Sequence, residues 1–239
     1  MTTFVLVHGA WGGSYGFRKL RPRLTQAGHE VFTPSLTGIG ERSHLAHPQV
    51  NLTTHITDVV NTIRYEDLDD LVLLGFSYGG AVVTGALDHI GDRVRHLVFL
   101  DAVVPSDGDT VAGVVGFPLP NQPGMVDRGA TWLIPPLPRQ LDDPTDQAFA
   151  DARRSMQPAG TFTERVQLST PLEDWPLTRT YIKATRDPNE SDDSAFWRAA
   201  HAAQASDAWA YREIPTHHLV PQSMPDALAA MLLGIAADG

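Results

Sequence analysis

The sequence predicts an α/β protein with a mostly parallel six-stranded sheet and helices on both of its faces. Short runs rich in β-branched residues alternate with stretches of helical spacing along most of the chain. One run, residues 71–74, is apolar at every position, as expected for a strand that is covered on both faces. Repeated strand–helix–strand units connect parallel strands through right-handed crossovers, and these place helices on both sides of the sheet.

The elements follow one another in a regular order. The six expected strands cover residues 4–7, 31–33, 71–74, 94–100, 180–184 and 208–214. The first expected helix, residues 15–27, ends at Gly28, and the second, residues 53–64, carries an apolar stripe. A helix of small residues is expected at 79–90. The last helix covers 225–235 and begins with Pro225, which suits a first helical turn.

The alternation stops between residues 105 and 176. Eleven prolines fall in this stretch, together with large apolar residues such as Phe117 and Trp132. A proline-rich insert that carries large apolar side chains is typical of a cap over a pocket rather than of a free linker. We therefore expect a single domain over residues 1–239, with a cap insertion at about 105–176.

Composition excludes several classes of function. The net charge is −10 and the acidic residues are dispersed, so no nucleic-acid partner is expected. The absence of cysteine excludes disulfides, a thiol nucleophile and a Cys-ligated metal, and the pair His44 and His47 lacks the Glu of a zinc protease motif. We expect no metal and no cofactor. Without a signal segment or an apolar run of 18 residues, the protein is expected to be cytoplasmic, with no membrane partner.

The pattern G-x-S-x-G occurs twice, around Ser14 and around Ser77. Ser14 comes seven positions after Val7, the end of the first expected strand, so Ser14 is expected to cap the helix that begins at Tyr15. Ser77 lies directly between a buried strand and a helix of small residues, which is the setting of a nucleophile on a sharp strand–turn–helix. Ser77 is therefore the predicted nucleophile.

A serine nucleophile needs a base and an acid that orients the base. In this architecture the chain order is serine, acid, histidine, with each residue near the carboxyl end of a strand. Among the ten histidines, His217 and His218 satisfy the position of the base. Asp187 follows the strand at 180–184 and is the favoured acid. Asp101, after the strand at 94–100, is the alternative.

The transition state also needs donors for the oxyanion. The expected donors are the backbone N–H groups of Tyr78, which follows the nucleophile, and of Ala10, in the glycine-containing loop after the first strand. Side chains near these loops and in the cap are expected to form an apolar or aromatic substrate pocket. We expect contributions from Gly9, Trp11, Phe76, Phe117 and Trp132.

Several segments resemble the esterase and hydroxynitrile-lyase branch of the α/β-hydrolases, similar to plant methylesterases and bacterial carboxylesterases. They are F-V-L-V-H-G-A-W (4–11), L-x-P-x-L-x-x-A-G-H-x-V (20–31), L-T-G-I-G-E-R (36–42), G-F-S-Y-G-G (75–80), Y-I-K-A-T-R-D (181–187) and the tail around His218 to Leu228. The resemblance implies an α/β-hydrolase fold and a Ser-His-Asp triad. It selects His218, seven residues before Pro225, as the base and agrees with Asp187 as the acid. Relatives of this kind are often dimers, so a homodimer is an expectation.

The departures from the family pattern favour one reaction. The lyases carry a threonine at the position of Gly9 and a lysine after the catalytic histidine, where this chain has Leu219. We therefore expect a serine carboxylesterase that cleaves small to medium apolar or aromatic esters through an acyl-enzyme. The alternatives are a hydroxynitrile-lyase-like or cofactor-free lyase or oxygenase, and a non-catalytic small-molecule receptor.

Overall fold

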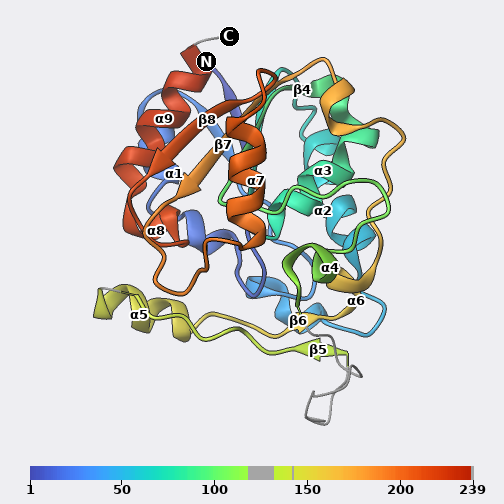
Figure 1. Ribbon diagram of the computed structural model, residues 1–239, viewed down its shortest axis with the longest axis vertical. Coiled ribbons are helices and arrows are strands. Elements are labelled where there is room, and N and C mark those ends of the chain that lie inside the picture. The colour runs from blue at the N-terminus through green and yellow to red at the C-terminus, as the bar shows by residue number, and fades with distance from the viewer. Residues whose placement is uncertain (118–131, 142, 238–239) are drawn as a thin grey trace.

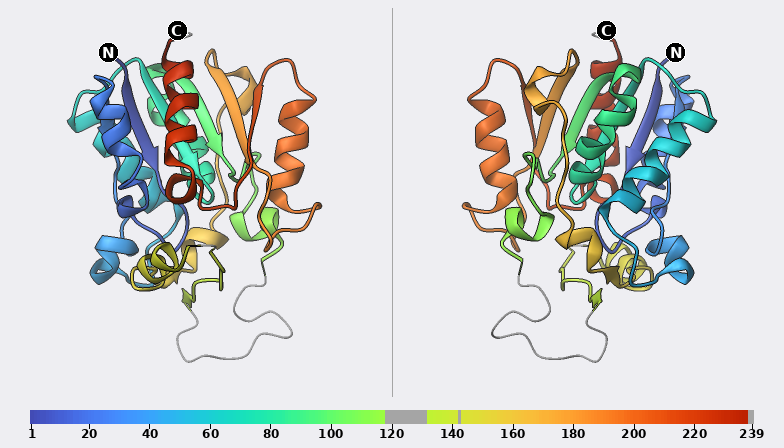
Figure 2. Two further views of the ribbon diagram at one scale, coloured as in Figure 1. Left: turned by 90° about the vertical axis from the view of Figure 1, so that its left-hand side faces the viewer. Right: turned by 90° about the vertical axis from the view of Figure 1, so that its right-hand side faces the viewer.

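A six-stranded parallel sheet forms the centre of the molecule. The computed structural model describes residues 1–117, 132–141 and 143–237. Its strands are β1 (Thr3–Val7), β2 (Glu30–Phe32), β3 (Leu71–Phe76), β4 (Val94–Leu100), β7 (Thr178–Ala184) and β8 (Ala210–Ile214). They lie in the order β2-β1-β3-β4-β7-β8, and every neighbouring pair is parallel (Figures 1 and 2). The prediction of a six-stranded sheet with helices on both faces is confirmed.

The central strands send alternate side chains to opposite faces of the sheet. In β3, for example, Leu71 and Leu73 join one buried cluster, whereas Val72 and Leu74 join the other. The first cluster is covered by α2 (Leu52–Tyr65), α3 (Gly79–Ile90) and α7 (Ala195–Gln204). The second is covered by α1 (Arg21–Gln26) and α9 (Pro225–Ala237). The fully apolar run of β3 therefore results from burial on both sides.

The first expected helix is two helices in the structure. The 3-10 helix η1 (Ser14–Phe17) is followed by α1, which has Pro22 in its first turn. Proline has no N–H to continue the preceding turn, so a new helix begins there. The expectation that Ser14 caps a helix is wrong: the cap position is Gly13, and the Ser14 hydroxyl donates to Glu41. Glu41 accepts the backbone N–H groups of Ser14 and Tyr15 and so performs the capping.

The segment between β4 and β7 contains short elements that lie at the carboxyl end of the sheet (Figure 2). They are α4 (Val111–Val115), β5 (Leu133–Ile134), α5 (Pro144–Asp151), β6 (Gln157–Pro158) and α6 (Gly160–Thr163). The same segment ends in η4 (Leu172–Asp174), which lies beside the start of β7, at the opposite end of the sheet. Strands β5 and β6 form an antiparallel pair. The remaining short helices are η2 (Gly40–Leu45), η3 (Gly91–Arg93) and α8 (Val220–Ser223).

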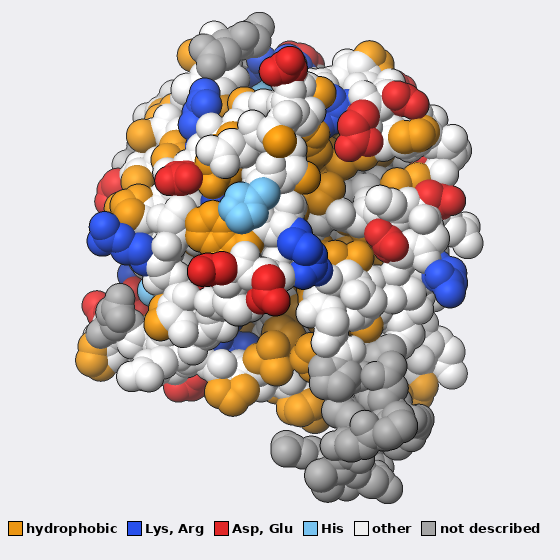
Figure 3. All heavy atoms as spheres, viewed as in Figure 1, with side chains coloured by type: hydrophobic (Ala, Val, Ile, Leu, Met, Phe, Trp, Pro, Cys, Tyr) orange, Lys and Arg blue, Asp and Glu red, His pale blue; other side chains and the backbone are white. Residues whose placement is uncertain are grey.

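The surface gives no sign of a single charged patch on the face drawn in Figure 3, where acidic and basic side chains are interspersed. Within the described part of the chain, no helix has both the length and the apolar character that crossing a bilayer requires.

Candidate active site

Ser77 stands on a strained turn between β3 and α3. Its φ is +56°, in the left-handed region that serine rarely adopts, and its backbone N–H donates to the carbonyl of Leu100 at 3.2 Å. The turn is tight because α3 begins only two residues later. A Cβ on Gly79 would lie 2.6 Å from the carbonyl oxygen of Val7, so the helix can approach β1 only with glycine there.

His218 joins the serine to a buried carboxylate. It follows β8, and its Nε2 lies 2.8 Å from Ser77 Oγ, while its Nδ1 lies 2.6 Å from Asp101 Oδ2. An ionised carboxylate can only accept, so Nδ1 carries the proton and Nε2 is free to accept the serine proton. Burial lowers the pKa of His218, and the nearby charge of Arg139 adds to this effect. The imidazole is therefore neutral near pH 7, as a general base must be.

The carboxylate that orients the His218 ring belongs to Asp101. The sequence favoured Asp187 for this position, and the structure does not place Asp187 against the ring. Asp101 follows β4 directly, has a φ of +43° and is fully buried. Burial alone would raise the pKa of Asp101, but the hydrogen bond from His218 and the charge of Lys183 outweigh it and leave the pKa below its ordinary value. Asp101 is therefore ionised when the site is at neutral pH.

Asp187 contacts the backbone of His218 rather than its ring. Its Oδ2 accepts the His218 backbone N–H at 3.1 Å and forms an ion pair with Arg139. Its Oδ1 accepts from the backbone and the side chain of Asn189. Burial would raise the pKa of Asp187, but Arg139 and Asn189 together hold it well below its ordinary value. Asp187 thus holds the loop that carries His218.

The sheet register explains why position 101 reaches the ring. Strands β3 and β4 are neighbours, and Phe76 pairs with Leu100, so the next residues, Ser77 and Asp101, leave the sheet side by side. Asp187 lies three residues beyond the end of β7, and its carboxylate meets the His218 backbone rather than the ring. The pairing of β3 with β4 is the signal that would have favoured Asp101, but sequence spacing alone does not show which strands are neighbours.

The loop after β1 lies against the nucleophile. A Cβ on Gly9 would come within 2.8 Å of Ser77 Cβ, so only glycine allows this contact. Ala10 and Tyr78, the two expected oxyanion donors, both line the same pocket as Ser77. The Tyr78 side chain points away into the core, where its hydroxyl lies 2.9 Å from His55 Nδ1. The Tyr78 hydroxyl is therefore engaged in the core, and its backbone N–H remains the expected oxyanion donor.

Two other histidines near the site hold the loops that surround it. His8 Nε2 accepts the backbone N–H of Leu36 at 3.1 Å, and its Nδ1 lies 2.9 Å from the Gly9 carbonyl. The ring of His217 accepts the backbone N–H of Leu219. Burial lowers the pKa of His8, so its ring stays neutral while it fixes the loop after β1.

The pocket above Ser77 is mainly apolar and has a volume of about 300 Å³. Four of the expected substrate-binding residues line it: Gly9, Trp11, Phe76 and Phe117. The fifth, Trp132, is not among the described lining residues. Phe162 and Phe196 also line it and were not expected. Phe162 packs on Tyr78 and Trp11, and Phe196 and Phe76 flank the His218 ring. The sequence offers no periodic signal for these two residues.

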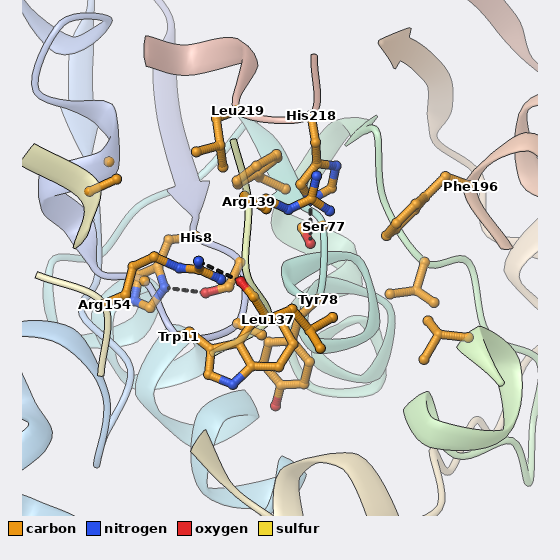
Figure 4. A pocket seen from close by; sticks show the side chains of 18 of the residues that line it. His8, Trp11, Ser77, Tyr78, Leu137, Arg139, Arg154, Phe196, His218 and Leu219 are labelled. Carbon is orange, nitrogen blue, oxygen red and sulfur yellow. Dashed lines mark hydrogen bonds between the residues drawn. The ribbon is translucent and has the colours of Figure 1, made fainter. Parts of the chain in front are cut away.

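Two arginines from the segment between β4 and β7 enter the pocket. Figure 4 shows Arg139 beside His218 and Ser77, and Arg154 on the side of Trp11. Arg154 donates to the carbonyl of Leu137 at 2.6 Å. The segment is also tied to the loop after β1, because the indole N–H of Trp11 donates to the carbonyl of Ile134 at 3.1 Å. In the described residues, no group of three or more histidine, aspartate or glutamate side chains could hold a metal ion.

Comparisons with known proteins agree with this architecture. Residues 4–231 match the model of the alpha/beta hydrolase family. A carbendazim-hydrolysing esterase from Nocardioides sp. (strain SG-4G) is 36% identical over 245 residues, which span 98% of this chain and 100% of that protein. Methylesterase 2 from Arabidopsis thaliana is 30% identical over 113 residues, covering 43% of this chain and 40% of that protein.

A solved structure shows the same fold. It is an extracellular alpha/beta-hydrolase from a Paenibacillus species, with a TM-score of 0.81, 24% sequence identity and 98% of each chain covered. Three findings agree: a buried strand leads to a strained serine, a histidine follows the last strand, and the family model matches most of the chain. The chain belongs to the alpha/beta hydrolase family.

Proposed function

We propose that this protein is a serine carboxylesterase that cleaves small to medium apolar or aromatic esters through an acyl-enzyme. The observation that carries the proposal is the continuous hydrogen-bonded series Ser77–His218–Asp101 at the base of an apolar pocket. The identity to a carbendazim-hydrolysing esterase over nearly the full chain supports ester hydrolysis.

In the first half of the reaction, Ser77 Oγ attacks the ester carbonyl carbon and His218 Nε2 takes the hydroxyl proton. Asp101 stabilises the imidazolium that forms and keeps the proton of Nδ1 in place. The tetrahedral intermediate then expels the alcohol, which receives the proton from Nε2. The acyl group remains on Ser77, and the neutral imidazole is restored.

In the second half, water enters the position that the alcohol has left. His218 takes a proton from the water, the hydroxide attacks the acyl carbon, and Ser77 leaves with that proton. In both halves the negative oxygen needs donors that are already in place. We assign these to the backbone N–H groups of Tyr78 and Ala10, which is supported by the close packing of Gly9 on Ser77.

The pocket lining supports esters with a flat aromatic part. Trp11, Phe117 and Phe162 form mutual ring contacts with centroids 5.7 to 6.3 Å apart. Such a cluster can stack on a planar acyl or alcohol group. Carbendazim, a methyl carbamate on a fused-ring heterocycle, has this shape, so we include it among the substrates to be tested.

The lyase alternative has little support in the pocket. Gly9 and Leu219 both line it, and neither can supply the hydroxyl or the ammonium group that the lyases have at these positions. The esterase among the similar proteins also favours hydrolysis over the alternatives.

The test is a comparison of two serine variants. We expect Ser77→Ala to lower the turnover of 4-nitrophenyl acetate and of aromatic methyl esters by several orders of magnitude while the melting temperature stays close to that of the wild type. Ser14→Ala removes the serine of the second G-x-S-x-G pattern and should keep its activity within a few-fold. Near-native turnover by Ser77→Ala would overturn the proposal.

A further inference from the structure

A lysine lies completely buried behind the catalytic carboxylate. Lys183, in β7, has no exposed side-chain surface, and its Nζ lies 2.7 Å from Asp101 Oδ1, 2.7 Å from Glu190 Oε2 and 2.7 Å from the Ala184 carbonyl. An ammonium group has three N–H donors, and here each has an acceptor. The Trp197 ring covers the remaining side, with its centroid 4.6 Å from Nζ.

The lysine fixes one oxygen of Asp101 and leaves the other for the histidine. Asp101 Oδ1 accepts from Lys183 and, at 3.3 Å, from the backbone N–H of Ala184. Oδ2 accepts from His218 Nδ1 at 2.6 Å. With both donors on one oxygen, the carboxylate cannot rotate about its Cβ–Cγ bond without losing them. The plane of the carboxylate therefore faces the imidazole before substrate arrives.

A buried ion pair is weak evidence for stability, because removing charges from water costs as much as the pair returns. Lys183 is thus poorly explained as a stabilising residue alone. Its second partner, Glu190, lines the substrate pocket and also accepts a hydrogen bond from the Ser194 hydroxyl. The series Glu190–Lys183–Asp101–His218–Ser77 runs from the pocket wall through the interior to the nucleophile.

We infer that Lys183 is a positioning residue for the proposed esterase reaction: it makes Asp101 the acid of the triad by holding that carboxylate, charged and correctly turned, against His218. The inference rests on the proposed function. Glu190 balances the ammonium group from the side of the pocket. Asp187, paired with Arg139 of the segment between β4 and β7, is then free to hold the His218 backbone.

The test measures kcat, KM and the pH dependence of kcat/KM for three variants. Lys183→Met removes the ammonium group, and Lys183→Met/Glu190→Gln also removes the carboxylate that would be left without a counter-charge. Arg179→Met is the matched control. Arg179 is also a buried cation on β7, but it bonds to the carbonyls of Leu172, Glu173 and Trp175, away from the site.

For both Lys183 variants we expect kcat to fall at least tenfold with KM changed less than threefold. We also expect the acid limb of kcat/KM, which follows the protonation of His218, to move to higher pH by roughly one unit, because the Asp101–His218 pair loses a buried cation that disfavours the protonated imidazole. The charged and titratable groups around Asp101 in the wild type are His218, Lys183, Glu190, Tyr181 and Tyr211. Arg179→Met should change the melting temperature without moving the acid limb.

If the Lys183 variants do not fold, Glu190→Gln gives the same information. This variant removes the carboxylate that partly offsets the ammonium charge, so the positive charge of Lys183 acts more strongly on Asp101 and His218. The acid limb should therefore move to lower pH by a few tenths of a unit.

The inference would be overturned if the double variant kept kcat within threefold of the wild type and its acid limb did not move. If Glu190→Gln is the only variant that folds, an unmoved acid limb in that variant would overturn the inference. Ser77→Ala is measured in parallel: if it retains full activity, the proposed function fails, whereas inactivity of Ser77→Ala with active Lys183 variants contradicts only the role of Lys183.

Discussion

The exchange of Asp101 for asparagine gives the sharpest test of which aspartate serves the histidine. In the structure one oxygen of Asp101 faces two donors, Lys183 Nζ and the Ala184 N–H, and the other faces His218 Nδ1. An asparagine must therefore place its carbonyl oxygen toward the two donors, which turns its NH₂ group toward Nδ1. Nδ1 then has to accept, and the ring proton moves to Nε2, where it faces Ser77 and blocks proton transfer.

The size of the effect follows from the loss of the base. An imidazole held in the wrong tautomer costs about 10⁴-fold in kcat, which is about 5.5 kcal/mol of activation free energy. Asp187→Asn is the matched control. Its amide oxygen can still accept the His218 N–H, but its NH₂ group then faces the two Asn189 donors, so those hydrogen bonds and the ion pair with Arg139 are lost. None of these contacts reaches the imidazole ring, so we expect less than a tenfold decrease in kcat.

The assay is steady-state hydrolysis of 4-nitrophenyl acetate by both variants, with thermal unfolding followed by circular dichroism to verify that each is folded. A larger decrease in kcat for Asp187→Asn than for Asp101→Asn would refute the reasoning, because it would mean that position 187 orients the ring during turnover.

Three further predictions use the same assay. Gly9→Ala places a Cβ 2.8 Å from Ser77 Cβ and should lower kcat at least tenfold. In the control Gly234→Ala the new Cβ would meet nothing within 4 Å, so kcat should not fall, and equal kcat values for the two variants would contradict the close packing of Gly9 on Ser77. Because burial lowers the pKa of His218 below the ordinary 6.5, the base stays unprotonated to lower pH, and kcat/KM at pH 6.5 should exceed half of its plateau; a half-maximal pH above 7 would show the opposite. Arg139→Met removes a charge that lowers the pKa of His218, so the acid limb of kcat/KM should move to higher pH, and a shift in the other direction would exclude this effect.

The fold was predictable because each element carries its own signal. Residues 71–74 are apolar throughout because β3 is buried on both faces. The helix at 79–90 is rich in small residues because α3 packs closely on its neighbours, with Gly79 against β1 and Gly85 against α2. Boundaries were less predictable. The helix expected at 15–27 begins again at α1 because Pro22 lies inside that stretch. The pattern of apolar residues does not indicate that one helix ends and another begins there.

The positions of the proposed nucleophile and base were predictable for a different reason. Both lie at strand ends: the glycines around Ser77 mark the first, and the second was narrowed to His217 or His218 by position and to His218 by the family pattern that the chain resembles. The acid was not, because two aspartates follow two strands and the choice depends on which strands are neighbours. Lys183, four residues before Asp187, lies in a strand that also carries Arg179, and its two carboxylate partners are 7 and 82 residues away in the chain, so the sequence does not show which cation serves the site.

Covalent labelling tests the central claim most directly. A fluorophosphonate reacts with a serine only when a base has activated it. Peptide mass spectrometry of the labelled protein should find one adduct, on the peptide that contains Ser77, formed in step with the loss of esterase activity and absent from His218→Ala. Full loss of activity with the adduct on the Ser14 peptide, or full activity after complete labelling of Ser77, would contradict the account.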